Sequence, residues 1–336
     1  MNLEQLRKLC FNTERFPKKV LDWIGEENLW NLWVPKRYGG LGAGLTEGLD
    51  RLYRLARIDG SLGWTVTLCA GANFFIGNLR PEIARELFGN PKNPVCFGGS
   101  GGVFGTAVKE GDDYLISGRW RYATGAPYLT HFTLNAKIMK NGKELKNADG
   151  SPLVRSFLLP KSEVGIIADW NAMGLKATAT HSFEVISARV HEKYSFGYQE
   201  VYLPDPLFKV PFPIFADLTL WVNYIGMTEH FLEGAAAILP EDGVAGLLSI
   251  IERAQRDLMG LAKEMENKAA APLVIANTEI YRIHLAAVTS VRLLTKGIME
   301  YYPLLGIQAC SEDHGLNQVF RDYFTATQHH IFTKTI

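Results

Sequence analysis

The chain has few cysteines, no surplus of charge and no long apolar run. Its 336 residues include four cysteines that are far apart and form no CxxC pair: Cys10, Cys69, Cys96 and Cys310. This spacing predicts buried thiols in a reducing compartment rather than a disulfide framework. Lys plus Arg and Asp plus Glu each number 35, so the formal net charge is zero. Because nucleic acids and anionic membranes attract basic surfaces, we expect no nucleic acid and no membrane as a partner.

Signals for export, membrane insertion and metal binding are also missing. Met1–Gln5 is too polar to begin a secretory signal. The most apolar run, residues 66–77, contains Asn73 and is too short to span a bilayer. The eight histidines show no ligand spacing, and a di-iron bundle site needs Glu-x-x-His motifs on two separate helices. We therefore expect a cytoplasmic protein without a metal site.

The period of the hydrophobic pattern divides the chain into three parts. Residues 1–94 show helical spacing, as in Leu49–Ala56. Residues 95–205 alternate with a period of two, as in Phe132–Ile138, and helical spacing returns over residues 214–336. We predict an α+β protein with an N-terminal helical domain, a middle antiparallel sheet or barrel, and a C-terminal helical bundle.

Glycine and proline mark the boundaries of these parts. The run Asn90–Pro94 ends the first part, and four prolines between residues 204 and 213 indicate a linker before the bundle. Asn141-Gly142 and Asp149-Gly150 are turn dipeptides typical of hairpins in the middle part. Within the last part, amphipathic patterns predict helices over residues 250–259, 273–301 and 316–332.

The most informative motif is Gly118–Ala126, which follows a strand predicted over Tyr114–Ser117. It places Tyr122, Thr124 and Gly125 close together where a strand leads into a turn. An aromatic side chain can cover one face of a flat ring system, a hydroxyl can bond its heteroatoms, and glycine lets the backbone approach closely. Taken alone, the motif is better explained by an ordinary strand aromatic that faces the core.

The glycine-rich run Phe97–Gly105 does not fit a nucleotide-binding loop. It lacks the GK[ST] of a triphosphate loop, and it leads into a strand rather than the helix that a dinucleotide fingerprint requires. We therefore exclude both kinds of nucleotide site for this run.

Four motifs, taken in order, resemble the acyl-CoA dehydrogenase superfamily of flavoproteins. They are Trp33–Gly42, Tyr122-Ala123-Thr124, Trp170–Thr178 and Phe320-Arg321-Asp322. The resemblance covers nearly the whole chain. It implies the fold of that superfamily, in which N-terminal helices, a central antiparallel β-barrel and a C-terminal helical bundle follow one another.

The resemblance also implies a flavin cofactor, either FAD or FMN. The cofactor-binding residues that it implies are Ser100, Tyr122, Ala123, Thr124, Gly125 and Thr178. In this family the counterpart of Tyr122–Thr124 lies against the flavin ring, and the loop that ends at Thr178 lies beside it. Two alternatives stay open: Thr178 satisfies only local backbone, and the run that contains Ser100 is only a turn.

Both positions at which the family carries its catalytic glutamate hold other residues here. The position nine residues after Arg321 is His330, and the Asp-Leu pair of the second arrangement is followed by Thr219. A general base must lie within hydrogen-bond reach of the proton that it removes. The sequence therefore disfavours ordinary acyl-CoA oxidation, although a histidine base or a relocated Glu229 or Glu233 stays open.

These departures resemble the two-component flavin-dependent monooxygenases built on the same fold, such as dibenzothiophene monooxygenase and 4-hydroxyphenylacetate hydroxylase. Enzymes of this kind take reduced flavin from a partner reductase and react it with oxygen. By this resemblance His329, eight residues after Arg321, is the catalytic candidate, since a neutral imidazole can donate or accept a proton near neutral pH. The alternative is a surface pair of His329 with His330.

We therefore predict a flavin-dependent oxidoreductase that acts on a small molecule, more specifically a monooxygenase that uses reduced flavin. One alternative is an acyl-CoA or other acyl-thioester dehydrogenase with a displaced base. Another is a flavin-free binding or scaffold protein, because the family's usual contacts to the adenosine end of FAD are reduced here to Gly306–Cys310. The resemblance also implies a flavin reductase as partner and a homodimer or homotetramer.

Overall fold

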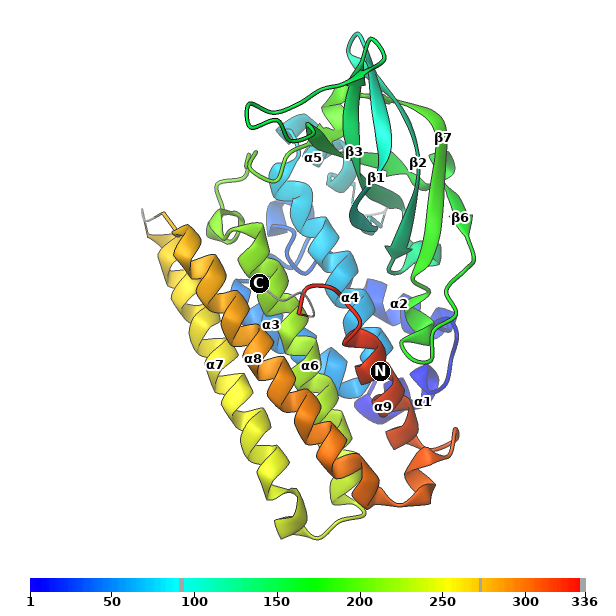
Figure 1. Cartoon of the computed structure of the whole chain (residues 1–336), viewed down its shortest axis with the longest axis vertical. Coiled ribbons are helices and arrows are strands. Elements are labelled where there is room, and N and C mark those ends of the chain that lie inside the picture. The colour runs from blue at the N-terminus through cyan, green and yellow to red at the C-terminus, as the bar shows by residue number, and fades with distance from the viewer. Residues whose placement is uncertain (91–93, 272–273, 333–336) are drawn as a thin grey trace.

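The computed structural model of the chain describes residues 1–90, 94–271 and 274–332. The sheet lies at one end of the elongated molecule, and the long helices of the bundle extend to the other (Figure 1). The helices are α1 (Leu3–Cys10), α2 (Lys18–Glu26), α3 (Leu45–Ile58), α4 (Gly60–Asn73), α5 (Pro81–Phe88), α6 (Phe212–Ala236), α7 (Ala245–Ala270), α8 (Asn277–Tyr301) and α9 (Gly315–Ala326). The strands are β1 (Phe97–Glu110), β2 (Asp113–Ala123), β3 (His131–Lys140), β4 (Lys143–Glu144), β5 (Val154–Pro160), β6 (Gly165–Ile167), β7 (His181–His191) and β8 (Ser195–Phe196). The predicted fold class is confirmed, because helices, sheet and helical bundle follow one another along the chain.

The strands form one eight-stranded sheet in the order β6-β7-β2-β1-β3-β5-β8, with β4 paired to β3. β1 and β2 pair antiparallel, with Gly105 opposite Gly118, whereas β1 and β3 pair in parallel. The parallel pair arises because the chain reverses direction twice, after β1 and after β2, and β3 then returns to the free side of β1. The sheet is therefore mixed, which differs from the wholly antiparallel barrel that the alternation predicts.

The glycine-rich run Phe97–Gly105 lies inside β1, so the alternative that this run is only a turn is wrong. Its pairing with β3 changes register between Ser100 and Val103 and again between Val103 and Gly105. Such irregularities bend a strand and change the direction of its side chains. Glycine is required at Gly99, where a Cβ would overlap the carbonyl oxygen of Thr133 on β3.

Two predicted helix ends differ from the structure. α8 begins at Asn277, while the predicted start at Leu273 lies outside the described residues. α9 ends at Ala326, so His329 and His330 lie in the turn after the helix rather than on it. Of the predicted break over residues 90–94, residues 91–93 also lie outside the described part of the chain.

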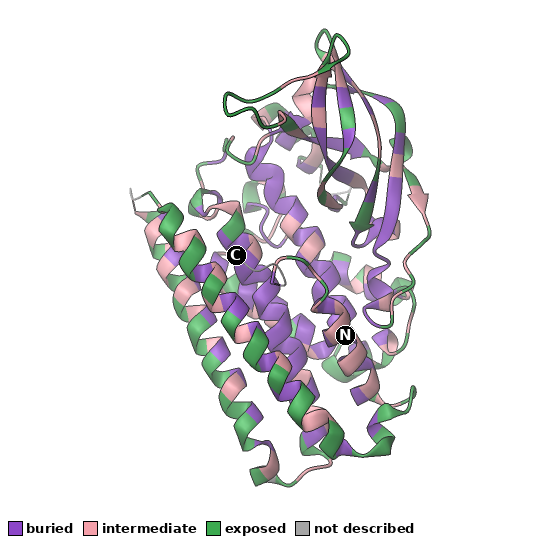
Figure 2. Ribbon diagram, in the orientation of Figure 1, coloured by how far each residue is buried: buried purple, intermediate pink, exposed green. Residues whose placement is uncertain are grey.

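Helix α4 lies at the centre of the molecule. All of its residues except Leu68 and Gly71 are buried, and it packs against α3, α6, α9 and β1. A helix that is apolar on all sides is a buried helix; Figure 2 shows α4 and α6 mostly buried, while α7 and α8 expose their outer faces. Of the described helices, none combines the length and hydrophobicity needed to cross a membrane. α4 carries Trp64, Thr65 and Cys69 to the site described below.

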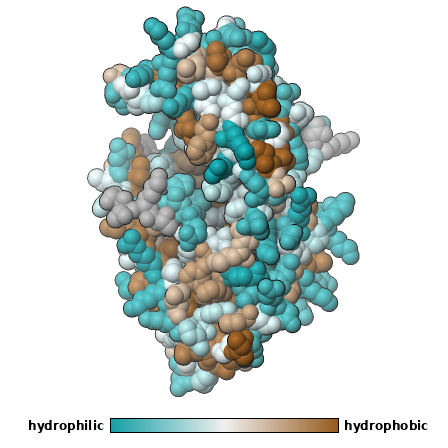
Figure 3. Space-filling model, turned by 45° about the vertical axis from the view of Figure 1, so that its right-hand side comes forward, coloured by the Kyte–Doolittle hydropathy of each residue, from teal (hydrophilic) through white to brown (hydrophobic). Residues whose placement is uncertain are grey.

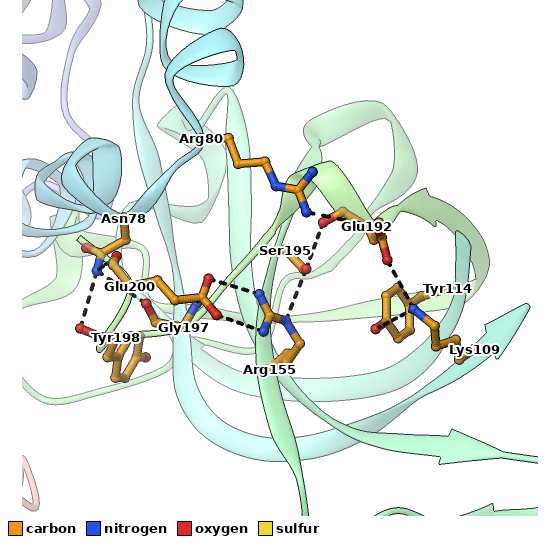
Figure 4. A network of polar contacts seen from close by, with 10 residues as sticks. All are labelled: Asn78, Arg80, Lys109, Tyr114, Arg155, Glu192, Ser195, Gly197, Tyr198 and Glu200. Carbon is orange, nitrogen blue, oxygen red and sulfur yellow. Dashed lines mark hydrogen bonds and ion pairs between the residues drawn. The ribbon is translucent and has the colours of Figure 1, made fainter. Parts of the chain in front are cut away.

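A network of polar contacts joins the sheet to the helices beyond α4 (Figure 4). Arg155 donates two hydrogen bonds of 2.9 and 3.1 Å to the Glu200 carboxylate, and the Glu200 carbonyl accepts one of 2.8 Å from the Asn78 amide. Glu192 accepts a hydrogen bond of 3.1 Å from Lys109. The network lines part of a polar cavity of about 240 Å³. Because its charged groups pair with one another, we assign this network to the junction between the sheet and the N-terminal helices.

Asn73, at the end of α4, connects the N-terminal helices to the sheet. Its side chain is fully buried. The amide nitrogen donates to the carbonyls of Trp30 and Val95, at 3.0 Å each, and the amide oxygen accepts from the Phe97 N–H at 2.7 Å. An asparagine amide offers two donor hydrogens and one acceptor oxygen, and this site uses all three.

We predict that Asn73→Leu destabilises the protein by about 3 kcal/mol or more, because leucine fills the volume but leaves three buried backbone groups without partners. Urea denaturation of the two proteins measures the difference. Asn267→Leu, at an exposed position of α7, is the control and is expected to change stability by less than about 0.5 kcal/mol. An equal effect of the two substitutions contradicts the role of Asn73.

Candidate functional site

The end of β2 directs the Tyr122 ring to the surface. Trp120 is fully buried and stacks on Phe183, with ring centroids 5.4 Å apart. The pairing of β2 with β7 then changes register between Trp120 and Ala123. Tyr122 has a φ of 68° and a 66% exposed side chain, a backbone conformation that residues other than glycine rarely adopt. The alternative of a core aromatic at this position is therefore wrong.

The residues after Tyr122 turn back into the protein. Ala123 is fully buried, and Gly125 has a φ of 76°. Its N–H donates a hydrogen bond of 2.8 Å to the carbonyl of Thr178. A Cβ at Gly125 would lie 2.9 Å from the Cys69 sulfur of α4, so glycine is needed for both its conformation and this close approach.

Three threonine hydroxyls meet behind this turn. The Thr124 and Thr180 hydroxyl oxygens are 3.1 Å apart, and those of Thr180 and Thr178 are 2.8 Å apart. The structure thus brings together the predicted Thr124 and Thr178 and adds Thr180, which the sequence argument missed. The sequence offered no local signal for Thr180, because Thr178 ends a 3₁₀ turn and Ala179 has a left-handed conformation with a φ of 43°, so the two threonines do not lie in extended chain.

The carbonyl of Leu175 closes this cluster. It accepts hydrogen bonds from the Thr178 hydroxyl at 2.7 Å and from the Trp170 indole N–H at 3.0 Å. Leu175 itself has a φ of 50°. The two ends of the loop over residues 170–178 are therefore both hydrogen-bonded to the Leu175 carbonyl.

The pair Arg321-Asp322 on α9 holds this loop in place. The Asp322 carboxylate accepts a hydrogen bond of 2.5 Å from the Leu175 N–H, and the Arg321 guanidinium donates one of 2.7 Å to the Met173 carbonyl. Gly174, between them, lies against the helix backbone, where a Cβ would overlap Arg321. The third and fourth motifs of the sequence are thus in direct contact, although Leu175 and Asp322 are 147 residues apart in the chain.

We predict that Gly174→Ala destabilises the protein by about 1–3 kcal/mol, because the added methyl group forces the loop away from α9. Urea denaturation measures this effect. Gly260→Ala is the matched control, since a Cβ there meets no atom within 4 Å and alanine favours the helix over glycine. A Gly174→Ala protein as stable as the wild type contradicts the close contact of loop and helix.

Two buried carboxylates lie next to each other beneath the loop. Asp59 caps α4 by accepting a hydrogen bond of 2.8 Å from the Leu62 N–H, and Gln318 donates to its other oxygen at 2.7 Å. Burial, followed by the nearby charge of Asp322, raises the pKa of Asp59 to about 8. Burial raises the pKa of Asp322 to about 6. The two helices that carry the site, α4 and α9, therefore meet at a pair of carboxyl groups that titrate near neutral pH.

The free energy of unfolding should fall as the pH rises from about 4 to about 8. The pKa of Asp59 is raised in the folded protein from an ordinary 3.8, so the unfolded chain loses this proton first, and stability decreases by up to about 1.4 kcal/mol per pH unit for one proton. Urea denaturation between pH 5 and 8 measures the slope. Asp59→Asn keeps the cap but has no proton to lose, so its slope is expected to be smaller; identical slopes contradict the prediction.

His329 lies in the turn after α9, against α4. Its ring meets the Trp64 ring edge-on, with centroids 5.6 Å apart, and stacks on His330 at 4.7 Å. Burial, followed by the charge of His330, lowers the pKa of His329 to about 4, so the ring is neutral at neutral pH. Its Nδ1 accepts a hydrogen bond of 3.4 Å from the Ile331 N–H, which places the ring hydrogen on Nε2.

His329 and the hydroxyl cluster are connected through α4. Trp64 contacts His329, and the neighbouring Thr65 has its methyl group 3.6 Å from where a Cβ at Gly125 would lie. Within the described residues, the Thr65 hydroxyl is buried without a hydrogen-bond partner. Buried polar groups are normally satisfied, and Thr65 is fully buried, so its hydroxyl is an unsatisfied polar group within the packing of α4 against the turn at Gly125.

Ser100 stands apart from the hydroxyl cluster. It pairs with Leu134 of β3, and its hydroxyl accepts a hydrogen bond of 3.3 Å from the Gly102 N–H. β1 approaches the turn at Gly98 instead, where a Cβ would lie 3.2 Å from the Thr124 carbonyl. Of the six cofactor-binding residues that we predicted, Ser100 is thus the one whose placement supports its role least.

The two glutamates considered as displaced bases are held in ion pairs. Glu233 binds Arg7 at 2.5 Å and also binds Arg57, while Glu229 lies 3.3 Å from Arg57. These contacts join α6 to α1 and α3. Both carboxylates therefore stabilise the packing of helices.

The sequence and fold match known proteins. Residues 241–334 match the family model described as "Acyl-CoA dehydrogenase, C-terminal domain". Indole-3-acetate monooxygenase of Acinetobacter baumannii is 25% identical over 331 residues, covering 92% of this chain and 82% of that protein. The enzyme of the same name from Pseudomonas putida is 28% identical over 219 residues, covering 64% of this chain. That match spans about half, 54%, of the Pseudomonas protein.

Solved structures extend the comparison to the whole fold. The HsaA monooxygenase from Mycobacterium tuberculosis superposes with a TM-score of 0.90 at 20% identity, over 98% of this chain and 91% of that one. XiaF from Streptomyces sp., solved in complex with FADH2 and glycerol, superposes with a TM-score of 0.87 at 20% identity, over 98% and 89%. The chain therefore has the acyl-CoA dehydrogenase-like fold, and its C-terminal part matches the model of that family's C-terminal domain. The two indole-3-acetate monooxygenases and HsaA, to which it is similar, are monooxygenases by name.

Proposed function

We propose that this protein is the oxygenase component of a two-component flavin-dependent monooxygenase, which uses reduced FAD or FMN and oxygen to hydroxylate a small molecule. The observation that carries the proposal is the exposed Tyr122 ring beside Thr124, held from behind by the loop that Arg321-Asp322 fixes. The names of the relatives, which include indole-3-acetate monooxygenase and a flavin-dependent oxygenase subunit, support the same class of activity.

The residues at this site fit a flavin. Tyr122 offers an exposed aromatic face for a flat ring system, Thr124 offers a hydroxyl at its edge, and the αL conformation of Gly125 keeps the backbone close. Phe104 of β1 and Ile186 of β7 also expose large apolar side chains, and Figure 3 shows hydrophobic residues on the surface at the sheet end of the molecule. When bound, reduced flavin supplies the electrons for the reduction of oxygen.

Within this proposal His329 is the catalytic residue. It is neutral at neutral pH because burial lowers its pKa to about 4, and its Nε2 carries the hydrogen. A neutral imidazole can donate this hydrogen to an oxygen atom and recover a proton afterwards. The partly buried position against Trp64 restricts the access of water to the ring.

The contacts of the carboxylates argue against the dehydrogenase alternative. Removal of an α-proton needs a carboxylate within reach of the substrate, but Glu229 and Glu233 are bound to arginines. Asp217 is buried between α6 and α8 and lies 3.1 Å from His284. Thr219, at one family position of the catalytic glutamate, donates its hydroxyl hydrogen to the Phe215 carbonyl at 2.8 Å.

We further propose a flavin reductase as partner, a cytoplasmic location and a homodimer or homotetramer. A relative named as an oxygenase subunit supports the first proposal. Buried thiols at Cys10, Cys69 and Cys96 suit a reducing compartment. The outer faces of α7 and α8 expose large apolar side chains such as Leu248 and Leu285, and exposed apolar patches are typical of interfaces between subunits.

The experiment that tests the proposal is titration of the purified protein with FAD and FMN, both oxidised and photoreduced. We expect binding of at least one flavin, and Tyr122→Ala should weaken it by about tenfold, because the ring loses its aromatic partner. Absorbance and fluorescence changes give the Kd. Tyr281→Ala, at an exposed tyrosine of α8, is the matched control.

Each outcome of this titration decides between the alternatives. No binding of either flavin in either redox state rules out both enzyme hypotheses and leaves the scaffold alternative. Binding that Tyr122→Ala does not weaken places the flavin elsewhere on the protein. Anaerobic bleaching of bound oxidised flavin by an acyl-CoA favours the dehydrogenase, whereas oxygen-dependent hydroxylation of an aromatic compound such as indole-3-acetate favours the monooxygenase.

A further inference from the structure

The hydrogen bonds of the hydroxyl cluster all run in one direction, which follows from the donors and acceptors that are available. A threonine hydroxyl has one hydrogen to donate, and a carbonyl oxygen can only accept. The Thr178 hydroxyl oxygen lies 2.7 Å from the Leu175 carbonyl oxygen, a distance that requires a hydrogen between them. The single hydrogen of Thr178 therefore points at Leu175.

The remaining hydrogens follow from this one. Because Thr178 has no hydrogen left, the contact of 2.8 Å between Thr180 and Thr178 must use the hydrogen of Thr180. By the same argument, the contact of 3.1 Å between Thr124 and Thr180 uses the hydrogen of Thr124. All three hydrogens point inward, and the Thr124 oxygen offers only lone pairs to a group outside the cluster.

Contacts around Leu175 keep this direction from reversing. Its carbonyl also accepts from the Trp170 indole, and its N–H is bound by Asp322, so the carbonyl cannot turn away from Thr178. Thr178 is fully buried, while Thr124 and Thr180 are 6% and 8% exposed. Water therefore has no access to Thr178 and cannot supply it with a different partner. The hydroxyls of the cluster that reach the outside are those of Thr124 and Thr180.

An acceptor at this position distinguishes the two redox states of a flavin. In oxidised flavin the ring nitrogen N5 has a lone pair and no hydrogen, so N5 held beside Thr124 would meet the hydroxyl's lone pairs without a hydrogen bond. In reduced flavin N5 carries a hydrogen that a lone pair can accept. A buried contact between two acceptors costs free energy, and a buried hydrogen bond gains it.

We propose that the inward-directed hydroxyls make Thr124 an acceptor that selects reduced over oxidised flavin, and that Thr180 and Thr178 are the residues that determine this selectivity. The inference rests on the proposed function, because it requires that Thr124 meets the N5 edge of the ring. Thr180 and Thr178 are positioning residues in this account: they act on the flavin only through the orientation of the Thr124 hydroxyl.

The test compares the Kd for oxidised and photoreduced flavin in wild type and in Thr180→Val. Valine keeps the shape of threonine but accepts no hydrogen bond, so the Thr124 hydrogen becomes free to donate to N5 of oxidised flavin. We expect the ratio of the oxidised to the reduced Kd to fall by about tenfold, mainly through tighter oxidised binding. For a two-electron couple, a tenfold change lowers the midpoint potential of the bound flavin by about 30 mV, which redox titration measures independently.

Controls separate orientation from packing. Thr180→Ser keeps the hydroxyl and should keep the wild-type ratio. Thr178→Val lets the Thr180 hydrogen turn to Thr124, so it should lower the ratio as Thr180→Val does and serves as the second variant if the first does not fold. Thr106→Val, at an exposed position of β1, should change neither Kd.

The outcomes distinguish this inference from the proposed function. If the wild type binds neither redox state, the proposed function fails and the inference falls with it. If flavin binds but Thr180→Val and Thr178→Val leave the ratio unchanged, or weaken both redox states equally, the proposed function stands and the inference is overturned. A lower ratio in both valine variants together with a wild-type ratio in Thr180→Ser supports it.

Discussion

The hydrogen bond from the Leu175 N–H to the Asp322 carboxylate joins segments 147 residues apart in the chain. The arrangement of the candidate site depends on this contact. It fixes the Leu175 carbonyl, which orients the Thr178 hydroxyl, and Thr178 in turn binds Gly125 through its own carbonyl. The turn that exposes the Tyr122 ring is therefore held, through a short series of hydrogen bonds, by a helix of the C-terminal bundle.

The protein buries a carboxylate to make this contact, which is unfavourable in itself. An isolated buried charge costs several kcal/mol unless it is paired or protonated. Asp322 lies next to a second buried carboxylate, that of Asp59. The Gln318 side chain donates a hydrogen bond of 2.7 Å to the Asp59 carboxylate. Burial raises the pKa of both groups, and the nearby charge of Asp322 raises that of Asp59 further. The same pair ends α4 and anchors α9, so the two helices that border the site are placed relative to each other at this point.

Sequence reasoning predicted the order of helices, sheet and bundle, because hydrophobic periodicity is a local property of each segment. It also proposed Tyr122 and Thr124 from the strand, the turn and the motif spacing, which are read within a few residues, and Thr178 from the family resemblance. The structure brings the two threonines together through Thr180. Sequence reasoning gave Ser100 as a cofactor-binding residue in a glycine-rich loop, with a simple turn as the alternative, whereas the structure has Ser100 in a strand whose pairing is irregular. It missed Thr180 because nothing in the local sequence distinguishes this threonine, near the start of a strand, until its partners in the fold are known. Sequence reasoning also did not predict the parallel pairing of β1 with β3, because which strands pair depends on segments that are far apart in the chain.

The sequence by itself determined the fold class, the resemblance to flavoproteins and the loss of both usual catalytic glutamates, because each depends on residue identity and spacing along the chain. Only the tertiary structure decided which hydroxyls meet, in which direction their hydrogens point and how the pKa of His329 is lowered to about 4. These properties depend on burial and on partners from distant segments. Hydrogen-bond direction and desolvation are set by the atoms within a few ångströms in space, and a linear pattern does not contain them.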